Sequence, residues 1–566
     1  MTRIITIFVV SKMYDYMKRI AILILCIVAM SHVWANDNQM FSYTQNLEVF
    51  SDVLKKLNIH YVDTVNLDKS VKHGISAMLA TLDPYTIYFT EEEAKEFAEQ
   101  NTGEYAGVGC TIMQRDSAVY ISEPFDNTPA QEVGLRAGDK IVMIENDTVL
   151  NWKSDEVSKR MRGLPNTNLR MLIERPGIDS LMEVNITRRI IQRNPVVYYG
   201  TIADGVGYIM LETFSEKAAD EVRKAFLDLK NNQGITSLIL DLRDNGGGLV
   251  NEAVKILNMF VPRGTTVLES RGKVENSNHI YKTEKEPLDT KIPLAVLING
   301  YTASASEVVA GTLQDLDRAV ILGDRSFGKG LIQQVFPLPY NRQLKVTVSY
   351  YYIPSGRSIQ AIDYTKRDAD GRVARMPDSL TNEFRTAGGR IVRDGGGITP
   401  DIAVKADTMS HLHYYLFTGH HIFDFATDYA SRHESIAPAQ EFYLTDDDYD
   451  AFKEFVHARD FKYDKMSSKR LEELREAMTF EGYMDEQATE LVKSIEERLQ
   501  HNVNKDLDTF RREIELSLTQ EIASRYYYQR GAIIVGMRGE PVTQRAIEIL
   551  QSPQQYNEIL SVNKKR

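Results

Sequence analysis

The chain has 566 residues, of which 43% are hydrophobic and 26% are charged, a composition that is ordinary for soluble globular proteins. This length exceeds what a single hydrophobic core usually serves, so three or four domains are expected. The formal net charge of −12 argues against nucleic acid and anionic lipid as the principal partners.

Residues 1–35 carry the features of a secretory signal. A charged segment runs from Met17 to Arg19, an apolar core from Ile20 to Met30, and Val33-Trp34-Ala35 resembles a small-residue cleavage site. Met17 is an alternative start of the chain. The sequence therefore predicts an exported protein of the periplasm or cell envelope, and membrane association through an uncleaved signal stays open as the alternative.

Residues 36–102 are predicted to form a helical segment. One helix begins near Phe41, a second covers Val71 to Leu82, and a third covers Glu91 to Gln100. The second helix ends at Leu82-Asp83-Pro84, because the residue before a proline is disfavoured in the α conformation. The apolar face of the first helix consists of Leu47, Phe50, Val53, Leu54 and Leu57.

Residues 103–190 change to short alternating strands separated by turns. The ordered motifs Gly107-Val108-Gly109, Pro129-Ala130 and Gly134 to Asp139 together resemble a PDZ domain of the protease-associated type. This resemblance implies that the backbone N–H groups of Gly107, Val108 and Gly109 bind a peptide carboxylate. The following strand, Cys110 to Gln114, would then accept the peptide by strand addition.

The same resemblance assigns the second wall of the peptide groove to a helix from Ser154 to Met161. Val157 and Met161 on this helix would contact the terminal side chain of the bound peptide. Substrates with free C-termini are therefore the predicted partners.

Residues 191–405 are predicted to be an α/β core. A strand from Gly207 to Thr213 is followed by a helix from Glu216 to Lys230 and a buried strand from Ile235 to Arg243. This strand ends in the turn Asp244 to Gly248. A glycine turn after a buried strand can present bare backbone N–H groups.

Ser304 is predicted to lie at a corner between a strand, Ile292 to Ile298, and a helix, Ser306 to Leu316. Backbone N–H groups at a helix N-terminus favour negative charge, so this corner suits an oxyanion and acyl transfer. The four residues from Ser304 to Glu307 also fit the S-x-x-E capping box, in which the serine is only a helix cap.

Lys329 lies between two glycines after a short strand, Ala319 to Leu322, and is the base that we pair with Ser304. Gly323 with Gly328-Lys329 also matches the phosphate loop G-x-x-x-x-G-K, so a nucleotide site is a competing hypothesis. It is disfavoured because Gly330 stands where the magnesium-binding Ser or Thr belongs. The residues after it, Leu331 to Leu338, are typical of a strand, whereas a phosphate loop precedes a helix.

The segments TASASE, QD, RA and FGKG-x-x-Q, in this order, resemble the C-terminal processing peptidases, also called tail-specific proteases. This resemblance covers roughly residues 40 to 405. It implies that Ser304 is the nucleophile, that Lys329 is the general base and that Gln333 orients the lysine, whereas Asp315 has a structural role.

The segment Leu242-Arg243-Asp244-Asn245-Gly246-Gly247 resembles the LR-x-N-x-GG element of that family. It implies an oxyanion hole formed by the N–H of Gly246 or Gly247 together with the N–H of Ala305. A lysine acts as a base only in its neutral form, so the site must lower the pKa of this lysine, mainly by burial.

Residues 406–566 carry apolar residues at helical spacing and are predicted to form a helical C-terminal domain. The histidines in this region do not match a structural zinc spacing. Packing onto the core, homo-oligomer formation and adaptor binding all remain open as roles for this domain.

We therefore expect a multidomain α/β protein with a helical N-terminal segment, a PDZ domain, an α/β serine-peptidase core and a helical C-terminal domain. The predicted function is that of an exported serine endopeptidase which selects substrates by their tails and needs no metal or cofactor. The alternative is a catalytically inactive scaffold whose PDZ domain binds tails.

Overall fold

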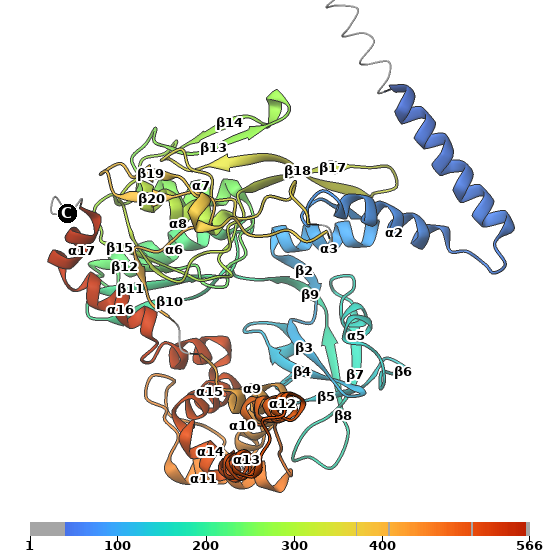
Figure 1. Ribbon diagram of the computed structural model, residues 1–566, viewed down its shortest axis with the longest axis vertical. Helices are drawn as coiled ribbons and strands as arrows, with labels where there is room; N and C mark the ends of the chain where they lie inside the picture. The colour runs from blue at the N-terminus through green and yellow to red at the C-terminus, as the bar shows by residue number, and fades with distance from the viewer. Residues whose placement is uncertain (1–39, 369–370, 406–407, 500–501, 562–566) are drawn as a thin grey trace, which may run out of the picture. The chain divides into compact units, whose positions relative to one another are not determined.

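The protein is described here by a computed structural model, which covers residues 40–368, 371–405, 408–499 and 502–561 (Figure 1). The predicted signal, residues 1–35, lies outside these ranges. The chain divides into two compact units between Tyr88 and Phe89. Within the described ranges, no helix has the length and apolar character required to cross a membrane.

The N-terminal unit contains a helix over residues 40–60, followed by α2 (Leu67–Ala80). The α2 helix begins four residues before the predicted start because the side chain of Asn66 caps it, accepting the N–H of Lys69. Asp83 stabilises the turn that follows this helix at the predicted break, because its side chain accepts hydrogen bonds from the N–H groups of Tyr85 and Thr86.

The second unit begins with α3 (Glu91–Thr102), which starts at a capping box between Thr90 and Glu93. An antiparallel sheet follows, with the strand order β3-β4-β5-β7-β8, and β6 pairs with β5. The separate pair β2–β9 joins this domain to its neighbours. The elements are β2 (Glu104–Gly107), β3 (Cys110–Arg115), β4 (Ala118–Pro124), α4 (Pro129–Glu132), β5 (Lys140–Ile144), β6 (Asp147–Thr148), α5 (Ser154–Met161), β7 (Asn168–Glu174), β8 (Met182–Thr187) and β9 (Arg189–Gln192).

The α/β core is built on a sheet with the order β10-β11-β12-β15-β16-β21. Only the pair β10–β11 is antiparallel, and the remaining neighbours are parallel. The strands are β10 (Val196–Ala203), β11 (Val206–Leu211), β12 (Ser237–Asp241), β15 (Leu294–Ile298), β16 (Val320–Gly323) and β21 (Ile402–Ala403). Every residue of β12, β15 and β16 is buried, as expected for a parallel sheet covered on both faces.

Helices cover both faces of this sheet. One face packs against α6 (Ala218–Asn231), α7 (Val250–Phe260) and α8 (Ala305–Asp315). The other face packs against α16 (Pro541–Leu550) and α17 (Pro553–Leu560), from the far end of the chain. The last two helices of the predicted C-terminal domain are thus part of the core, and the sequence pattern did not reveal this.

A second antiparallel sheet of the core contains β17, β18, β13 and β14 in that order. Its strands are β13 (Thr266–Gly272), β14 (His279–Lys282), β17 (Leu331–Pro337) and β18 (Gln343–Tyr352). The short 3-10 helices η1 (Glu275–Ser277) and η2 (Asp378–Leu380) and the hairpin β19 (Glu383–Arg385) and β20 (Ile391–Arg393) complete the core.

The other C-terminal helices form a separate region. They are α9 (His411–Thr418), α10 (His421–Arg432), α11 (Asp446–Ala458), α12 (Met466–Glu481), α13 (Glu486–Leu499), α14 (Val503–Thr509) and α15 (Arg511–Gly536). Of these, α9, α10, α11, α14 and α15 share an apolar core, and α12 packs against α13. The predicted fold class is confirmed, and each strand and helix predicted for the α/β core is present with boundaries shifted by a few residues.

Candidate active site

The predicted catalytic residues follow three neighbouring strands. Gly246 and Gly247 follow β12, Ser304 follows β15, and Lys329 follows β16. These strands are parallel and adjacent, so their carboxyl ends lie along one edge of the sheet. This edge is the usual place for a ligand in an open α/β sheet.

Ser304 lies directly before α8 with a φ of 58° and a ψ of −117°. A positive φ in a residue with a Cβ is uncommon and stores of the order of 1–3 kcal/mol of strain, which persists only where the surroundings enforce it. Ser304 is buried apart from 8% of its surface. The chain therefore turns sharply at this serine and presents it at the beginning of the helix.

Glu307 connects the serine corner to the lysine loop. Its carboxylate is fully buried and accepts the N–H of Ser304 at 2.9 Å, the N–H of Lys329 at 2.8 Å and the N–H of Gly328 at 2.7 Å. The hydroxyl of Ser326 donates to the same carboxylate. One oxygen, Oε2, accepts from both Ser304 and Lys329, so the two backbones are held next to each other.

Two opposing effects act on this carboxyl group. Burial away from water raises the pKa of Glu307, and the four hydrogen bonds oppose that rise. The glutamate half of the predicted capping box is present, since Glu307 accepts the N–H of Ser304. The same residue also holds the Lys329 loop, which the capping motif alone does not predict.

Tyr351 of β18 bridges the same two backbones from the other side. Its buried hydroxyl lies 2.7 Å from the carbonyl oxygen of Lys329 and 3.2 Å from the carbonyl oxygen of Ser304. The N–H of Tyr351 donates to the carbonyl of Gly330 at 3.0 Å. Glu307 and Tyr351 together therefore fix the serine corner and the lysine loop by six backbone groups: the N–H and the carbonyl of Ser304, the N–H of Gly328, the N–H and the carbonyl of Lys329, and the carbonyl of Gly330.

The glycine turn lies against the serine corner. A Cβ placed on Gly247 would be 2.7 Å from the carbonyl oxygen of Ala303 and 2.9 Å from the backbone nitrogen of Ala305, so only glycine fits. The N–H of Gly247 donates to the side chain of Asn245. Gly246 is exposed and faces open space, so its N–H is the more accessible donor of the two.

The lysine loop depends on its glycines. Gly328 has a φ of 89°, and a Cβ there would lie 2.4 Å from the Cβ of Ala361. Lys329 is half-buried and leads into strand β17. The nucleotide hypothesis is wrong, because a phosphate loop must lead into a helix. Gln333 of β17 donates to the hydroxyl of Thr347 at 3.2 Å.

Asp315 lies at the end of α8 and forms a buried ion pair with Arg357, at 2.9 Å. Its carboxylate also accepts the N–H of Ser355. These contacts anchor the segment after β18 and agree with the structural role that the sequence resemblance implied.

The predicted peptide groove has an open strand edge. β3 is the outermost strand of its sheet, and α5 packs beside it. Gly109 has a φ of 84°, and a Cβ there would lie 2.4 Å from the Cβ of Thr128. Within the described ranges, no hydrogen bond is shown from the N–H groups of Val108 and Gly109, whereas their carbonyls accept from Ala130 and Phe125. These two N–H groups are therefore candidates for binding a carboxylate, which must reach them from the edge of β3 because both residues are buried.

Val157 and Met161 are placed differently from the prediction. Both side chains belong to the apolar core of this domain, with 0% and 4% of their surface exposed. A contact from either side chain to a bound tail would therefore require the groove to rearrange.

Comparisons with known proteins identify the domains and the family of the chain. Residues 205–368 match the model of peptidase family S41, residues 97–174 match the PDZ domain, and residues 412–550 match the C-terminal helical domain of probable PDZ-proteases. The carboxy-terminal-processing protease of Bartonella bacilliformis is 34% identical over 60% of this chain and 78% of its own length. The chain belongs to peptidase family S41, among the carboxy-terminal-processing proteases. It is a serine-type peptidase with a PDZ domain.

Other relatives and solved structures match this S41 peptidase over different shares of their length. The probable CtpA-like serine protease of Staphylococcus aureus strain MRSA252 is 32% identical over 56% of this chain, which spans 62% of that relative. Among solved structures, the photosystem II D1 C-terminal processing protease is 27% identical, with a TM-score of 0.34 over 62% of this chain and 85% of that chain. The peptide-bound PDZ domain of the carboxy-terminal protease from Vibrio cholerae is 24% identical, with a TM-score of 0.15 over 16% of this chain and 99% of that one.

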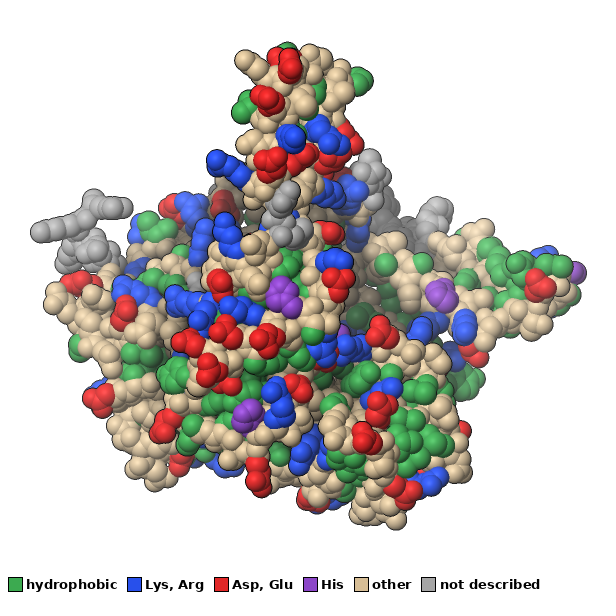
Figure 2. All heavy atoms as spheres, turned by 90° about the horizontal axis from the view of Figure 1, so that it is seen from below, with side chains coloured by type: hydrophobic (Ala, Val, Ile, Leu, Met, Phe, Trp, Pro, Cys, Tyr) green, Lys and Arg blue, Asp and Glu red, His purple; other side chains and the backbone are tan. Residues whose placement is uncertain are grey.

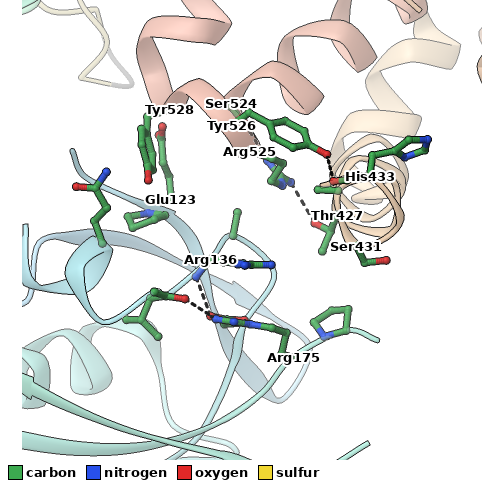
Figure 3. Close-up of a pocket in the computed structure, with 18 of the residues that line it drawn as sticks. Glu123, Arg136, Arg175, Thr427, Ser431, His433, Ser524, Arg525, Tyr526 and Tyr528 are labelled. Atoms are coloured by element: carbon green, nitrogen blue, oxygen red, sulfur yellow. Dashed lines mark hydrogen bonds and ion pairs between the residues drawn. The ribbon is translucent and has the colours of Figure 1, made fainter. Parts of the chain in front are cut away.

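The PDZ domain of this S41 peptidase packs against the C-terminal helices around a cavity of about 670 Å³ (Figure 3). Glu123, Arg136 and Arg175 line it from the PDZ domain, and Thr427 and Arg525 line it from α10 and α15. The lining of this cavity contains none of the three predicted catalytic residues, Ser304, Lys329 and Gln333.

An ion pair joins β3, the strand predicted to accept a peptide, to the C-terminal helices. Arg115, the last residue of β3, contacts Asp424 of α10 at 2.6 Å. On the next strand, burial raises the pKa of Glu123, and the negative charge of the nearby Glu521 raises it further. The strand expected to receive a substrate tail is thus fastened to the C-terminal helical domain.

Sequence reasoning missed two residues of the S41 site. Tyr351 lies in a predicted strand and carries no motif, and Glu307 was interpreted only as a helix cap. The signal for Glu307 was present, since its capping motif includes the proposed nucleophile, but its bonds to Ser326, Gly328 and Lys329 come from a loop about twenty residues later.

Proposed function

We propose that this S41 peptidase is an exported endopeptidase that uses Ser304 as nucleophile and Lys329 as general base, and that its PDZ domain selects substrates by their C-terminal tails. The observation that carries the dyad is the shared carboxylate of Glu307, which accepts the backbone N–H groups of both residues. Burying a carboxylate costs free energy, which its four hydrogen bonds offset. Here these bonds hold a candidate nucleophile beside a candidate base.

The proposed reaction is acyl transfer. Neutral Lys329 removes the hydroxyl proton of Ser304, and the serine oxygen attacks the scissile carbonyl carbon. The resulting oxyanion accepts hydrogen bonds from the N–H groups of Gly246 and Ala305. When the C–N bond breaks, the protonated lysine returns its proton to the leaving amine.

Water completes the cycle. Lys329 takes a proton from the water, which attacks the ester carbon, and the proton then passes to the oxygen of Ser304 as the acid product leaves. Gln333 is proposed to orient the lysine from β17. Its hydrogen bond to Thr347 supports this role by fixing the glutamine side chain on the strand that follows the lysine loop.

Tail selection is proposed to use the free N–H groups of Val108 and Gly109, with Gly107, for the terminal carboxylate. The open edge of β3 would then pair with the backbone of the tail, which gives affinity with little demand on sequence. Val157 and Met161 remain proposed contacts to the terminal side chain and would need to move for that role.

The decisive experiment incubates an unfolded protein that has a free C-terminus with the wild type, Ser304→Ala and Lys329→Ala. We expect each variant to keep its fold and to lose cleavage, because neither the hydroxyl nor the amine has a local replacement. Cleavage retained by either variant would rule out the dyad. If the wild type itself does not cleave the substrate but still binds tail peptides, the protein is instead an inactive tail-binding scaffold.

A second experiment tests tail selection separately. Amidating the substrate C-terminus removes a set of charge-assisted hydrogen bonds, each worth roughly 1.5 to 3 kcal/mol, so cleavage should slow about tenfold or more. Equal rates for free-acid and amidated substrates would contradict carboxylate capture. Export is tested by the N-terminal sequence of the protein purified from its host, which should begin at Asn36.

A further inference from the structure

The segment between β12 and the glycine turn carries one long charged side chain that the proposed mechanism does not use. Arg243 follows Asp241, the last residue of β12, by two positions and precedes Gly246 by three. Its guanidinium contacts the carboxylate of Asp241 at 2.5 Å and that of Glu540 at 2.8 Å. It also donates to the hydroxyl of Thr543 at 3.3 Å, across 300 residues of chain. The far end of the chain therefore reaches the segment that leads into the turn.

Glu540 stands at the beginning of α16. Its carboxylate caps this helix by accepting the N–H of Val542 at 3.1 Å and the N–H of Thr543 at 2.8 Å. The helix lies beside β12 and β15 and covers one face of the core sheet (Figure 1). Burial raises the pKa of Glu540, but the charge of Arg243 and the bonds from α16 outweigh this effect and lower the pKa overall. The carboxylate is therefore ionised and fixed on a packed helix.

The ion pairs of Arg243 differ from those on the surface. Blue and red side chains mix over the face shown in Figure 2, and ion pairs between such exposed groups contribute little to stability. The side chain of Arg243 is only 18% exposed, and those of Asp241 and Glu540 are 0% and 20% exposed. A charge buried to this extent depends on well-placed partners. Glu540 is the partner that comes from outside the strand to which Arg243 is joined.

Gly246 depends on its neighbours for its position. A Cβ placed on it would meet no atom within 4 Å, so the glycine itself packs against nothing that would fix it. On one side, the carbonyl of Gly247 accepts the N–H of Phe214 at 3.0 Å. On the other side, the side chain of Asn245 bonds to the core, and that of Arg243 bonds to α16. Three supports thus set the direction of the Gly246 N–H, and one of them ends at Glu540.

We propose that Glu540 is a positioning residue of this peptidase, which holds Arg243 and thereby keeps the Gly246 N–H aimed at the oxyanion. The inference rests on the oxyanion hole proposed above. An oxyanion exists only after the serine has attacked, so a misdirected donor weakens the transition state and not the bound substrate. Loss of the contact between Glu540 and Arg243 should therefore lower kcat and leave KM unchanged.

Two substitutions separate this role from helix capping. Glu540→Asn keeps a good helix cap, but its shorter, neutral side chain cannot reach Arg243. Glu540→Gln keeps one oxygen that can accept from Thr543 and Arg243, and it loses the bond from Val542. Capping alone predicts that the asparagine variant is the less damaged of the two. Positioning predicts the opposite order for kcat, with the asparagine variant the slower.

The matched control is Glu548→Gln on the same helix. Glu548 pairs with Arg545 at 2.7 Å, and both side chains are about half exposed, so this variant removes a charge and an ion pair from α16 without touching Arg243. The full chain is used in every case. Cleavage of an unfolded protein with a free C-terminus gives kcat and KM, and hydrogen exchange of residues 242–248 reports on the turn without requiring activity.

We expect kcat to fall about tenfold in Glu540→Asn, severalfold in Glu540→Gln and not at all in the control, since removing an oxyanion donor altogether costs about 10²–10³. A peptide aldehyde becomes a tetrahedral oxyanion when Ser304 adds to its carbonyl carbon. Its affinity should fall by the same factors, while a free-acid tail peptide binds equally well to all four proteins. Hydrogen exchange in residues 242–248 should be fastest in Glu540→Asn and unchanged in the control.

Unchanged exchange in Glu540→Asn would overturn the proposal, and so would faster exchange with a wild-type kcat. A loss of kcat that the control shares, or that follows the thermal midpoints of the variants, would show that Glu540 only stabilises the fold and would also overturn it. Failure of the proposed dyad is a separate result, seen as cleavage by Ser304→Ala, and it leaves the exchange measurement valid.

Discussion

Replacing Glu307 with glutamine is the most informative single change at the proposed site. The substitution keeps the shape of the side chain and replaces one of its two acceptor oxygens with an NH₂ donor. Oε2 accepts from Ser304 and Lys329, whereas Oε1 accepts from Ser326 and Gly328. The amide nitrogen should occupy the Oε1 position, because the hydroxyl of Ser326 can rotate to accept, but a backbone N–H cannot.

The cost follows from the donors that remain. The N–H of Gly328 would face another donor while buried, which costs about 1–3 kcal/mol. The bonds from Ser304 and Lys329 would change from charge-assisted to neutral, which costs roughly 1 kcal/mol each. Because these bonds place the serine and lysine backbones, we expect kcat/KM to fall by at least about tenfold, mostly through kcat.

The assay combines steady-state cleavage with a thermal unfolding midpoint. Glu252→Gln is the matched control, since Glu252 is also buried and accepts a backbone N–H, that of Ala219, but its hydrogen bonds within the described ranges do not involve the serine corner or the lysine loop. The control should lose stability and keep its kcat when folded. If Glu307→Gln retains the wild-type kcat and thermal midpoint, the role that we assign to this carboxylate is wrong.

Four further predictions concern other contacts of the structure. Tyr351→Phe removes a hydroxyl that bridges the carbonyls of Ser304 and Lys329, so kcat should fall severalfold at an unchanged KM, and a wild-type kcat would count against this bridge. Gly109→Ala adds a Cβ at a positive φ against Thr128 and should weaken binding of a tail peptide at least about tenfold, whereas Gly134→Ala, also at positive φ but facing open space, should not. Arg115→Glu and Asp424→Arg should each speed hydrogen exchange in β3, and the double variant should restore protection; equal effects in all three would exclude a direct pair. Burial raises the pKa of Glu123, so the folded protein binds this proton more tightly than the unfolded chain, and the contribution of Glu123 to stability is lost as pH rises through the raised pKa. Glu123→Gln should therefore raise the thermal midpoint at pH 7.5 more than at pH 5, which a pair of melting curves would check.

Much of the fold could be predicted because its signals are local. The strand before Ser304 and the helix after it appear as an apolar run followed by helical spacing, and both are present as β15 and α8. The order of short motifs around Ser304 and Lys329 likewise indicated the peptidase family before any contact was known. The apolar face of the helix over residues 40–60 is also readable from spacing alone.

The parts that could not be predicted depend on contacts between distant segments. Helical spacing in residues 541–560 shows that one face is buried, but not that it covers the second face of the core sheet. In the same way, the resemblance assigned Val157 and Met161 to the wall of the peptide groove, and only the packed domain shows that both side chains belong to its apolar core.

The amino-acid sequence by itself determined the secondary structure of the core, the likeness to the S41 peptidases and the identity of the candidate nucleophile and base, because these follow from short-range patterns. Only the tertiary structure decided how that pair is held. Glu307 and Tyr351 reach Lys329 across 22 residues of chain in each direction, by contacts that the strand order β12-β15-β16 and the second sheet create. Hydrogen bonds across such separations depend on how sheets and loops pack, and the spacing of apolar residues along the chain does not predict that packing.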